Sequence, residues 1–298
     1  MKKHIQNLNK CAHLPIVFGL VSLATSNAAI ISVNFHVGDD GDNQAAHELD
    51  GTEEAGIART RTSSWNNVNV GAGGNNAAAT QIFAPASLTD DTGGAAGTLT
   101  STLTAGEGST WFGGYGGSSA SGGAELDNDI SDDGLFNSYL ALNGPSGDGS
   151  PEDNFVLTIS GLGSEFTSNG YNIIIYSETD RGGAGVNSTA ARTSFFTISA
   201  GGSTSTILTE DDNVTGPGTT RTFDGNYVQS DGNGAGVNYS NYVESGILTA
   251  DTFTIEVTAS NNGGRGGISG FQIVAVPEPS SLGLLGLGLL GLAVRRRR

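Results

Sequence analysis

Residues 171–176 read YNIIIY, a nearly continuous apolar run. A short run that is apolar on both faces is typical of a strand in the middle of a sheet. Residues 31–37, ISVNFHV, alternate instead, so their four apolar residues lie on one face and His36 lies on the opposite face, where we expect it to be solvated. The two patterns together predict a central strand and a half-covered strand of one β domain.

Further candidate strands follow along the chain, and segments rich in glycine, asparagine and proline separate them. These strands are expected at residues 98–104, 155–160, 194–200, 205–209, 252–258 and 268–274. Loops are expected at 71–79 and 113–123, and an internal linker at 141–153. Many short strands without long helices between them favour an all-β fold, an antiparallel two-sheet β-sandwich of jelly-roll type.

The N-terminus has the order of parts of a secretory signal peptide. Three lysines precede an apolar stretch at 14–24, and small residues follow at 25–29. This order predicts export and cleavage after Ala28. Cys11, the only cysteine, comes before the apolar stretch, so we expect neither a lipid anchor nor a disulfide in the mature protein.

The C-terminal tail also has three parts. The prolines of Pro277-Glu278-Pro279 favour an extended, protease-accessible backbone. Residues 282–294 are apolar and uncharged, and as a helix they reach only roughly 20 Å, which makes a marginal membrane span. Four arginines close the chain and would hold that end on the cytoplasmic side: Arg295, Arg296, Arg297 and Arg298.

This order of parts closely resembles the PEP-CTERM sorting signal of Gram-negative bacteria. The resemblance covers residues 276–298 and implies that an exosortase recognises Pro277-Glu278-Pro279 and that the tail is then removed. It also implies transient anchoring in the inner membrane, followed by a place at the cell surface or in the exopolysaccharide matrix. The expected organisation is therefore a signal peptide at 1–28, a β-sandwich domain at 29–276 and a sorting signal at 277–298, with signal peptidase and exosortase as transient partners.

A second resemblance concerns the fold of the mature part. The motifs at 31–35, 64–67 (SWNN), 156–163, 170–176 and 267–274 look like those of exported bacterial proteins with a galactose-binding or malectin-like jelly roll. The resemblance implies a jelly-roll fold, and it implies no particular ligand.

The mature domain is strongly acidic. It contains 29 carboxylates, all those of the chain except Glu278, against six arginines and no lysine, which gives a net charge of −23. Nucleic acid and anionic lipid are poor partners for such a surface, whereas divalent cations and neutral polymers are compatible with it. We therefore expect contact with a membrane only through the sorting helix.

Few residues for catalysis remain in the mature part. His36 and His47 are its only histidines, and no G-x-S-x-G motif occurs, so a three-histidine zinc site is excluded and a serine–histidine site has little support. Glycoside cleavage by two carboxylates about 5 to 9.5 Å apart stays open, because acids are plentiful. A secreted polysaccharide-active enzyme is thus an alternative function.

An acidic segment at 127–134 is the best candidate for a metal site. Oxygen donors alternate at Asp127, Asp129, Ser131 and Asp133, as would suit a calcium ion with six to eight oxygen ligands. The EF-hand pattern fails, because Asp132 stands where the glycine of that loop should be. A solvated acidic loop is the favoured interpretation, and Ca²⁺ is the only cofactor that we consider.

Two aromatic segments suggest sugar binding. Trp111 and Tyr115 lie in the glycine-rich stretch WFGGY, and Trp65 precedes two asparagines. Packing is the favoured role of both tryptophans, more strongly so for Trp65. The main hypothesis is an exported, non-enzymatic surface or matrix protein with a carbohydrate-binding role as one expectation, and a purely structural matrix protein is a further alternative.

Overall fold

The computed structural model describes residues 28–38, 48–49, 51–72, 74–76, 82–104, 109–114, 135–136, 138–143, 154–177, 193–210, 226–230, 240–259 and 267–277. The stretch Ala28–Pro277 forms one compact unit. No helix in the described ranges is long and apolar enough to cross a membrane. The apolar run at 282–294 lies outside these ranges.

Strands dominate the described chain, so the predicted all-β class is confirmed. The one helix among the described residues, α1 (Ser164–Thr167), is four residues long. The strands are β1 (Ile30–Gly38), β2 (Asn66–Ala72), β3 (Gly74–Asn76), β4 (Ala86–Thr89), β5 (Ala95–Thr104), β6 (Ser109–Gly114), β7 (Ser138–Asn143), β8 (Asn154–Ser160), β9 (Tyr171–Tyr176), β10 (Thr193–Ala200), β11 (Ser203–Glu210), β12 (Tyr242–Glu244), β13 (Thr252–Ala259), β14 (Gly267–Ile268) and β15 (Gly270–Ala275).

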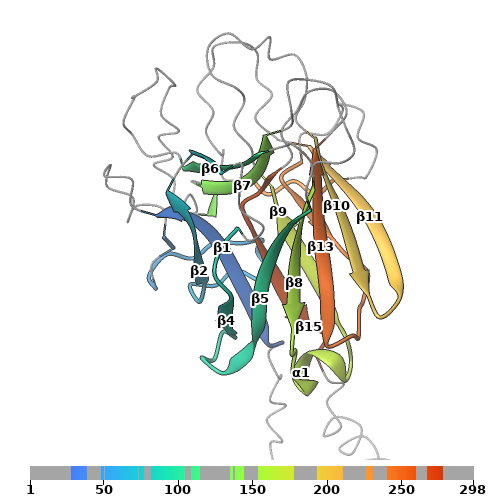
Figure 1. The fold of residues 1–298 in the computed structure, drawn as a ribbon. Helices are drawn as coiled ribbons and strands as arrows, with labels where there is room; N and C mark the ends of the chain where they lie inside the picture. The colour runs from blue at the N-terminus through green and yellow to red at the C-terminus, as the bar shows by residue number, and fades with distance from the viewer. Residues whose placement is uncertain are drawn as a thin grey trace, which may run out of the picture. The chain divides into compact units, whose positions relative to one another are not determined.

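Two large sheets form a sandwich. One has five strands in the order β12-β9-β15-β1-β2, and the other has six in the order β11-β10-β13-β8-β5-β4; in Figure 1 strands of the six-stranded sheet lie in front of β15 and β9. Neighbouring strands are antiparallel except for β1 and β2, which run parallel. The run at 171–176 is β9, which lies between β12 and β15 as the prediction of a non-edge strand requires.

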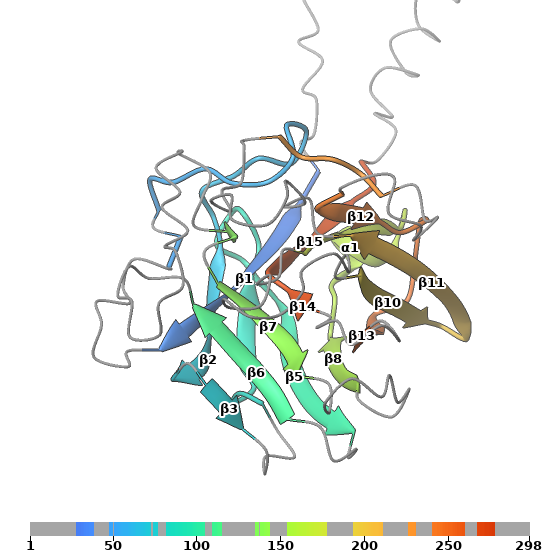
Figure 2. The ribbon, with the colours of Figure 1, turned by 90° about the horizontal axis from the view of Figure 1, so that it is seen from above.

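A third, four-stranded sheet was not expected from the sequence. Its order is β14-β7-β6-β3, and it lies across the end of the sandwich at which β1 ends (Figures 1 and 2). β2 and β3 occupy part of the expected loop at 71–79, β6 reaches Gly114, and β7 includes the first residues of the expected linker at 141–153. Pairing between these short strands supplies the backbone hydrogen bonds that their glycine-rich sequences require in any fold.

The hydrophobic core fills the space between the two large sheets. From β1 it takes Ile31, Val33 and Phe35, all fully buried, as their alternation predicts. β8 shows the same alternation, with every second side chain buried from Phe155 to Ile159. Each fully buried side chain of this size contributes about 1.5–3 kcal/mol, so a core of this extent holds the domain together without a disulfide.

The two ends of the domain lie side by side. β1 and β15 are antiparallel neighbours, and Ile30 at the start of β1 pairs with Val274 near the end of β15. We call this the junction end of the sandwich; it lies at the bottom of Figure 1, next to α1. Short described connections also meet there: residues 90–94, 161–170, 201–202 and 245–251.

Candidate functional site

The outer face of the five-stranded sheet is covered by the chain itself. Residues 51–65 cross it, and a small second core forms between this covering segment and the sheet. Ile174 and Tyr176 of β9 are fully buried there, against Ala55 and Ile57 of the covering segment. This face is therefore not an open binding surface.

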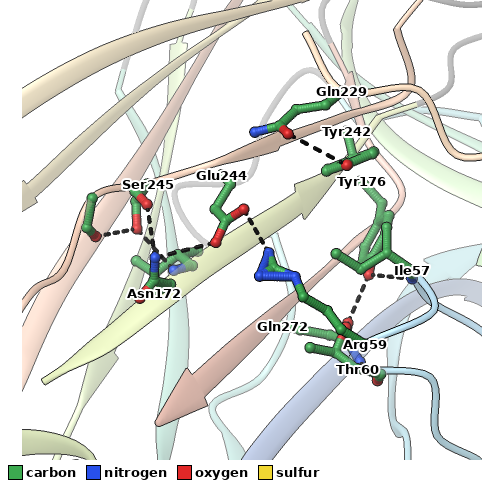
Figure 3. A network of polar contacts seen from close by, with 12 residues as sticks. Ile57, Arg59, Thr60, Asn172, Tyr176, Gln229, Tyr242, Glu244, Ser245 and Gln272 are labelled. Atoms are coloured by element: carbon green, nitrogen blue, oxygen red, sulfur yellow. Dashed lines mark hydrogen bonds and ion pairs between the residues drawn. The ribbon is translucent and has the colours of Figure 1, made fainter. Parts of the chain in front are cut away.

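A buried polar network holds the covering segment in place (Figure 3). The Gln272 side-chain oxygen accepts hydrogen bonds from the Tyr176 hydroxyl and from the Thr60 hydroxyl, each at 2.6 Å. Its amide nitrogen donates to Ser32 Oγ at 3.0 Å and to the Thr60 carbonyl at 2.8 Å. Burial raises the pKa of Tyr176, so its hydroxyl stays protonated and donates. A buried side-chain amide whose oxygen and nitrogen are both hydrogen-bonded has a structural role, not a reactive one.

An ion pair closes the rim of this network. Arg59 Nη2 lies 2.5 Å from Glu244 Oε2, and the other carboxylate oxygen of Glu244 accepts a hydrogen bond from Asn172 at 3.2 Å. The Arg59 side chain is half exposed, so the pair contributes little to stability by itself. Its place at the rim fits a fastening role for the covering segment.

His36 is not solvated, which corrects the expectation from its strand. Its residue is only 5 % exposed, and Nε2 lies 3.6 Å from Glu48 Oε1. The alternation placed it correctly on the polar face of β1. The error arose because a segment that follows later in the chain covers that face.

The SWNN motif serves packing and hydrogen bonding. Trp65 donates from Nε1 to the Thr62 carbonyl at 2.8 Å, and its ring centroid lies 6.3 Å from that of Tyr176. Asn66 donates from Nδ2 to the carbonyl of Thr89 at 2.8 Å, and its Oδ1 accepts from the Thr89 N–H at 2.9 Å. The motif thus fastens β2 to its neighbours, as the packing interpretation of Trp65 predicts.

The outer face of the six-stranded sheet has a different character. No described element covers it, and hydroxyl side chains occupy most of its positions. We call this surface the hydroxyl face. Its members are Thr98, Thr100, Thr102, Thr158, Ser160, Thr197, Ser199, Thr204, Thr206, Thr252, Thr254 and Thr258, all partly or fully exposed.

The strand register aligns these hydroxyls in rows. Thr100 pairs with Thr158, which pairs with Thr254. The same row continues through Ser199 to Thr204, whose hydroxyl oxygens lie 3.3 Å apart. Since strands lie about 4.8 Å apart, this row is about 19 Å long. It crosses five adjacent strands without a charged residue.

The hydroxyl face carries little charge and one aromatic ring. Among its described side chains Glu256 is the one charged group, and its carboxylate accepts a hydrogen bond from Asn154 Nδ2. Phe195, partly exposed, lies on the same face at the end of β10 away from the junction end. The face therefore offers hydroxyls, threonine methyl groups and an aromatic side chain.

Among the described carboxylates away from this face, Asp90 has a shifted pKa. Partial burial raises the pKa of Asp90, but hydrogen bonds from the Thr92 hydroxyl and from the backbone N–H groups of Gly94, Thr92 and Gly93 outweigh it and hold the pKa below the ordinary 3.8. Asp90 thus caps a turn as an anion. Among the described residues no three His, Cys, Asp or Glu side chains lie close enough to hold a metal ion.

The junction end leads directly into the predicted processing motif. The Val276 N–H donates to the Gly170 carbonyl at 2.8 Å, and Pro277, the next residue, is exposed. Residues 275–298 match the family model of the PEP-CTERM protein-sorting motif. The chain is therefore an exported protein that is sorted through an exosortase. The PEP-CTERM match begins at Ala275, the last residue of β15, so motif and folded domain overlap.

No curated protein matches the chain in sequence. The likeness of the mature part to galactose-binding and malectin-like jelly rolls therefore remains a prediction. The PEP-CTERM motif is the part of the chain whose function the comparisons establish.

Most of the predicted site residues lie outside the described part of the chain. Ala28 and Pro277, which flank the domain, are described. Trp111 is in β6, where it pairs with Asn75 and Ala141, and nothing is described of its side chain. The following lie outside the described residues: Tyr115, Asp127, Asp129, Asp133, Glu278, Pro279, Arg295, Arg296, Arg297 and Arg298. The calcium site at 127–133 and the sugar site at Trp111 and Tyr115 stay predictions.

The hydroxyl face was not predicted from the sequence. Its signal is visible in the chain as threonine or serine at every second position, as in TLTST at 98–102 and, except for Glu256, in TFTIEVT at 252–258. Each segment alone only indicates a strand with one solvated face. The array exists because five strands bring these positions into register.

Proposed function

We propose that the mature domain is a non-enzymatic protein of the cell surface or extracellular matrix that binds a neutral polysaccharide through the hydroxyl face. The observation that carries this proposal is the row of Thr100, Thr158, Thr254, Ser199 and Thr204 across five adjacent strands. Export through the PEP-CTERM motif brings the domain to the compartment where such polymers lie.

The chemistry of the hydroxyl face suits a sugar polymer. Each hydroxyl both donates and accepts hydrogen bonds, as the hydroxyls of a pyranose do, and water can bridge those pairs that are too far apart for direct contact. Threonine methyl groups and the Phe195 ring offer apolar contact for the C–H faces of sugars. An extended polymer that lies along the row meets several such groups at once, which adds many weak contacts into a useful affinity.

The charge distribution favours a neutral polymer. The domain carries 29 carboxylates, yet Glu256 is the one charged group among the described side chains of the hydroxyl face. The high β propensity of threonine explains its presence in strands, but it does not explain why Glu256 is the one acid among the described side chains of this face. A surface with few charges limits the desolvation cost that carboxylates would impose on a bound neutral sugar.

The opposite sheet strengthens the assignment. Its outer face is covered by residues 51–65, so the hydroxyl face is the broad sheet surface left open among the described elements. Binding there leaves the junction end free. A domain exported in this way would stay in the matrix because it binds the polymer.

Binding of the processed protein to immobilised polysaccharides tests the proposal. We expect retention on neutral polymers such as dextran, cellulose or galactan, with little change between low and high salt because no ion pairs form. Release of new reducing ends from a bound polymer would support instead the carboxylate enzyme of the sequence analysis. If the protein bound no neutral polymer, the remaining alternative would be a purely structural matrix protein.

A further inference from the structure

The junction end leaves almost no linker between the folded domain and the motif that is processed. The Ala275 N–H donates to the Ala29 carbonyl at 2.9 Å, and the Val276 N–H donates to the Gly170 carbonyl at 2.8 Å. Pro277 follows at once. The recognition motif therefore starts where the hydrogen bonds of the sheet end.

The reach of the chain brings the membrane close to this end. Five residues, 277–281, separate Val276 from the apolar run, and fully extended they span at most about 18 Å. The headgroup layer takes roughly 5–8 Å of that distance. A membrane-embedded enzyme that acts on Pro277-Glu278-Pro279 thus works within about 10 Å of the folded sandwich, and the junction end is the part of the domain nearest to it.

An exposed apolar side chain stands beside the exit of the chain. Ile247 is 62 % exposed, the most exposed large hydrophobic residue of the described chain. It lies over Gly170, because a methyl group placed on Gly170 would come within 2.5 Å of Ile247 Cγ2. Gly170 in turn accepts the hydrogen bond from Val276. The apolar group is thus one residue away from the strand end that continues into the motif.

Carboxylates lie in several of the connections at the same end. Asp90 and Asp91 lie in the turn after β4, Glu165 lies in α1 and Asp251 precedes β13, and all four are partly or fully exposed. The described arginines, Arg59 and Arg61, belong to the covering segment and not to this end. Such a surface repels anionic headgroups and suits a protein partner with an apolar centre and a basic rim.

We propose that the junction end, with the exposed Ile247 beside the exit of the chain and these four carboxylates in its connections, is a docking surface for the exosortase that processes the tail. Docking aligns Pro277-Glu278-Pro279 with the enzyme while the domain stays folded. This surface lies at the junction end and not on the hydroxyl face. A chain that does not bind polymer can therefore still be processed, and a chain that is processed slowly can still bind polymer.

The test follows tail removal from the full chain in a bacterium that makes an exosortase. We compare the half-time of processing for the native chain and for Ile247→Asp, with Val228→Asp as the matched control, since Val228 is 39 % exposed and lies in the segment paired with β12. Ile247→Asp is expected to slow processing roughly tenfold, the factor for about 1.4 kcal/mol of lost binding. Val228→Asp is expected to process at the native rate.

A spacer separates docking from folding effects. A Gly-Ser insert of about twelve residues between Val276 and Pro277 spans roughly 19 Å on average and lets the enzyme reach the motif without touching the domain. In the spacer chain Ile247→Asp should no longer slow processing. The proposal would be overturned if both variants without the spacer were processed at the native rate. It would also be overturned if Ile247→Asp still slowed processing in the chain with the spacer. Binding of the processed protein to vesicles that depends on Ile247 would overturn it too, because it would make lipid the partner.

Discussion

The Tyr176 hydroxyl donates a hydrogen bond to the Gln272 side-chain oxygen at 2.6 Å, between two neighbouring strands and beneath a covering segment. The same hydroxyl accepts a hydrogen bond from the Ile57 N–H at 3.1 Å. One side chain of β9 thus ties the sheet to the segment that covers it. These two hydrogen bonds help to keep this face closed.

Replacement of Tyr176 by Phe removes that hydroxyl and keeps the ring. We expect a loss of about 1–3 kcal/mol in the free energy of unfolding, because the Ile57 N–H is left buried without its partner. Tyr242→Phe is the control, since its hydroxyl makes a single long contact of 3.5 Å to Gln229, and it should change stability by less than about 0.5 kcal/mol. Chemical denaturation of both variants measures the difference. Equal losses would contradict the fastening role of Tyr176.

Gly170→Ala should destabilise the junction end. Gly170 has a φ of 90°, and a Cβ there would lie 2.8 Å from the Leu248 carbonyl oxygen. The left-handed backbone alone costs an Ala about 1–2 kcal/mol, and the backbone contact adds to it. Gly246→Ala is the matched control, because nothing lies within 4 Å of its Cβ position. Thermal unfolding should show a lower midpoint for Gly170→Ala and an unchanged one for Gly246→Ala, and a shared midpoint would refute the steric account.

The contribution of Asp90 to the stability of its turn should fall in acid. The pKa of Asp90 is lower in the folded chain than its ordinary value of 3.8, so its contribution to stability is present above that value and is lost as the pH falls through the folded pKa. Asp90→Asn keeps an acceptor for the turn but removes the titration. The difference in stability between native chain and variant should therefore shrink below about pH 4. A difference that stays constant from pH 6 to pH 2 would show that the charge is irrelevant.

Two cuts should appear in the protein recovered outside the cell. Signal peptidase is expected to cut after Ala28 and exosortase near Pro277-Glu278-Pro279, at chain ends that the β1–β15 pairing holds side by side. Intact-mass measurement of the released protein reads both ends, and a covalently attached glycan would leave the terminal peptides identifiable. A released species that still carries Arg295–Arg298 would contradict sorting by this route.

The strand patterns predicted the two large sheets well. The alternation at 31–37 gave the core face of β1, and the apolar run at 171–176 gave β9, because both patterns report burial directly. β2, with the sequence NNVNVGA, was missed since asparagine and glycine disfavour strands, and its place depends on side-chain hydrogen bonds such as that of Asn66 to Thr89. β12 has three residues, too few for any pattern.

The polar features depend on contacts that no local pattern contains. Thr60 and Gln272 are 212 positions apart, and their hydrogen bond helps to hold the covering segment on one sheet face. The hydroxyl face likewise requires the register of five strands. The sorting motif was predictable because its parts are contiguous and each acts through its own local chemistry.

The central claim is that the hydroxyls of the sheet bind a neutral polysaccharide, and one comparison of affinities tests it most directly. The triple variant Thr100→Val, Thr158→Val, Thr254→Val removes three neighbouring hydroxyls of the row and keeps branched side chains suited to strands. The triple variant with Ser at the same positions keeps the hydroxyls. At about 0.5–1.5 kcal/mol for each lost hydrogen bond, the Val variant should bind its polymer at least about tenfold more weakly. The Ser variant should bind almost as the native protein does. Native affinity in the Val variant would contradict the claim.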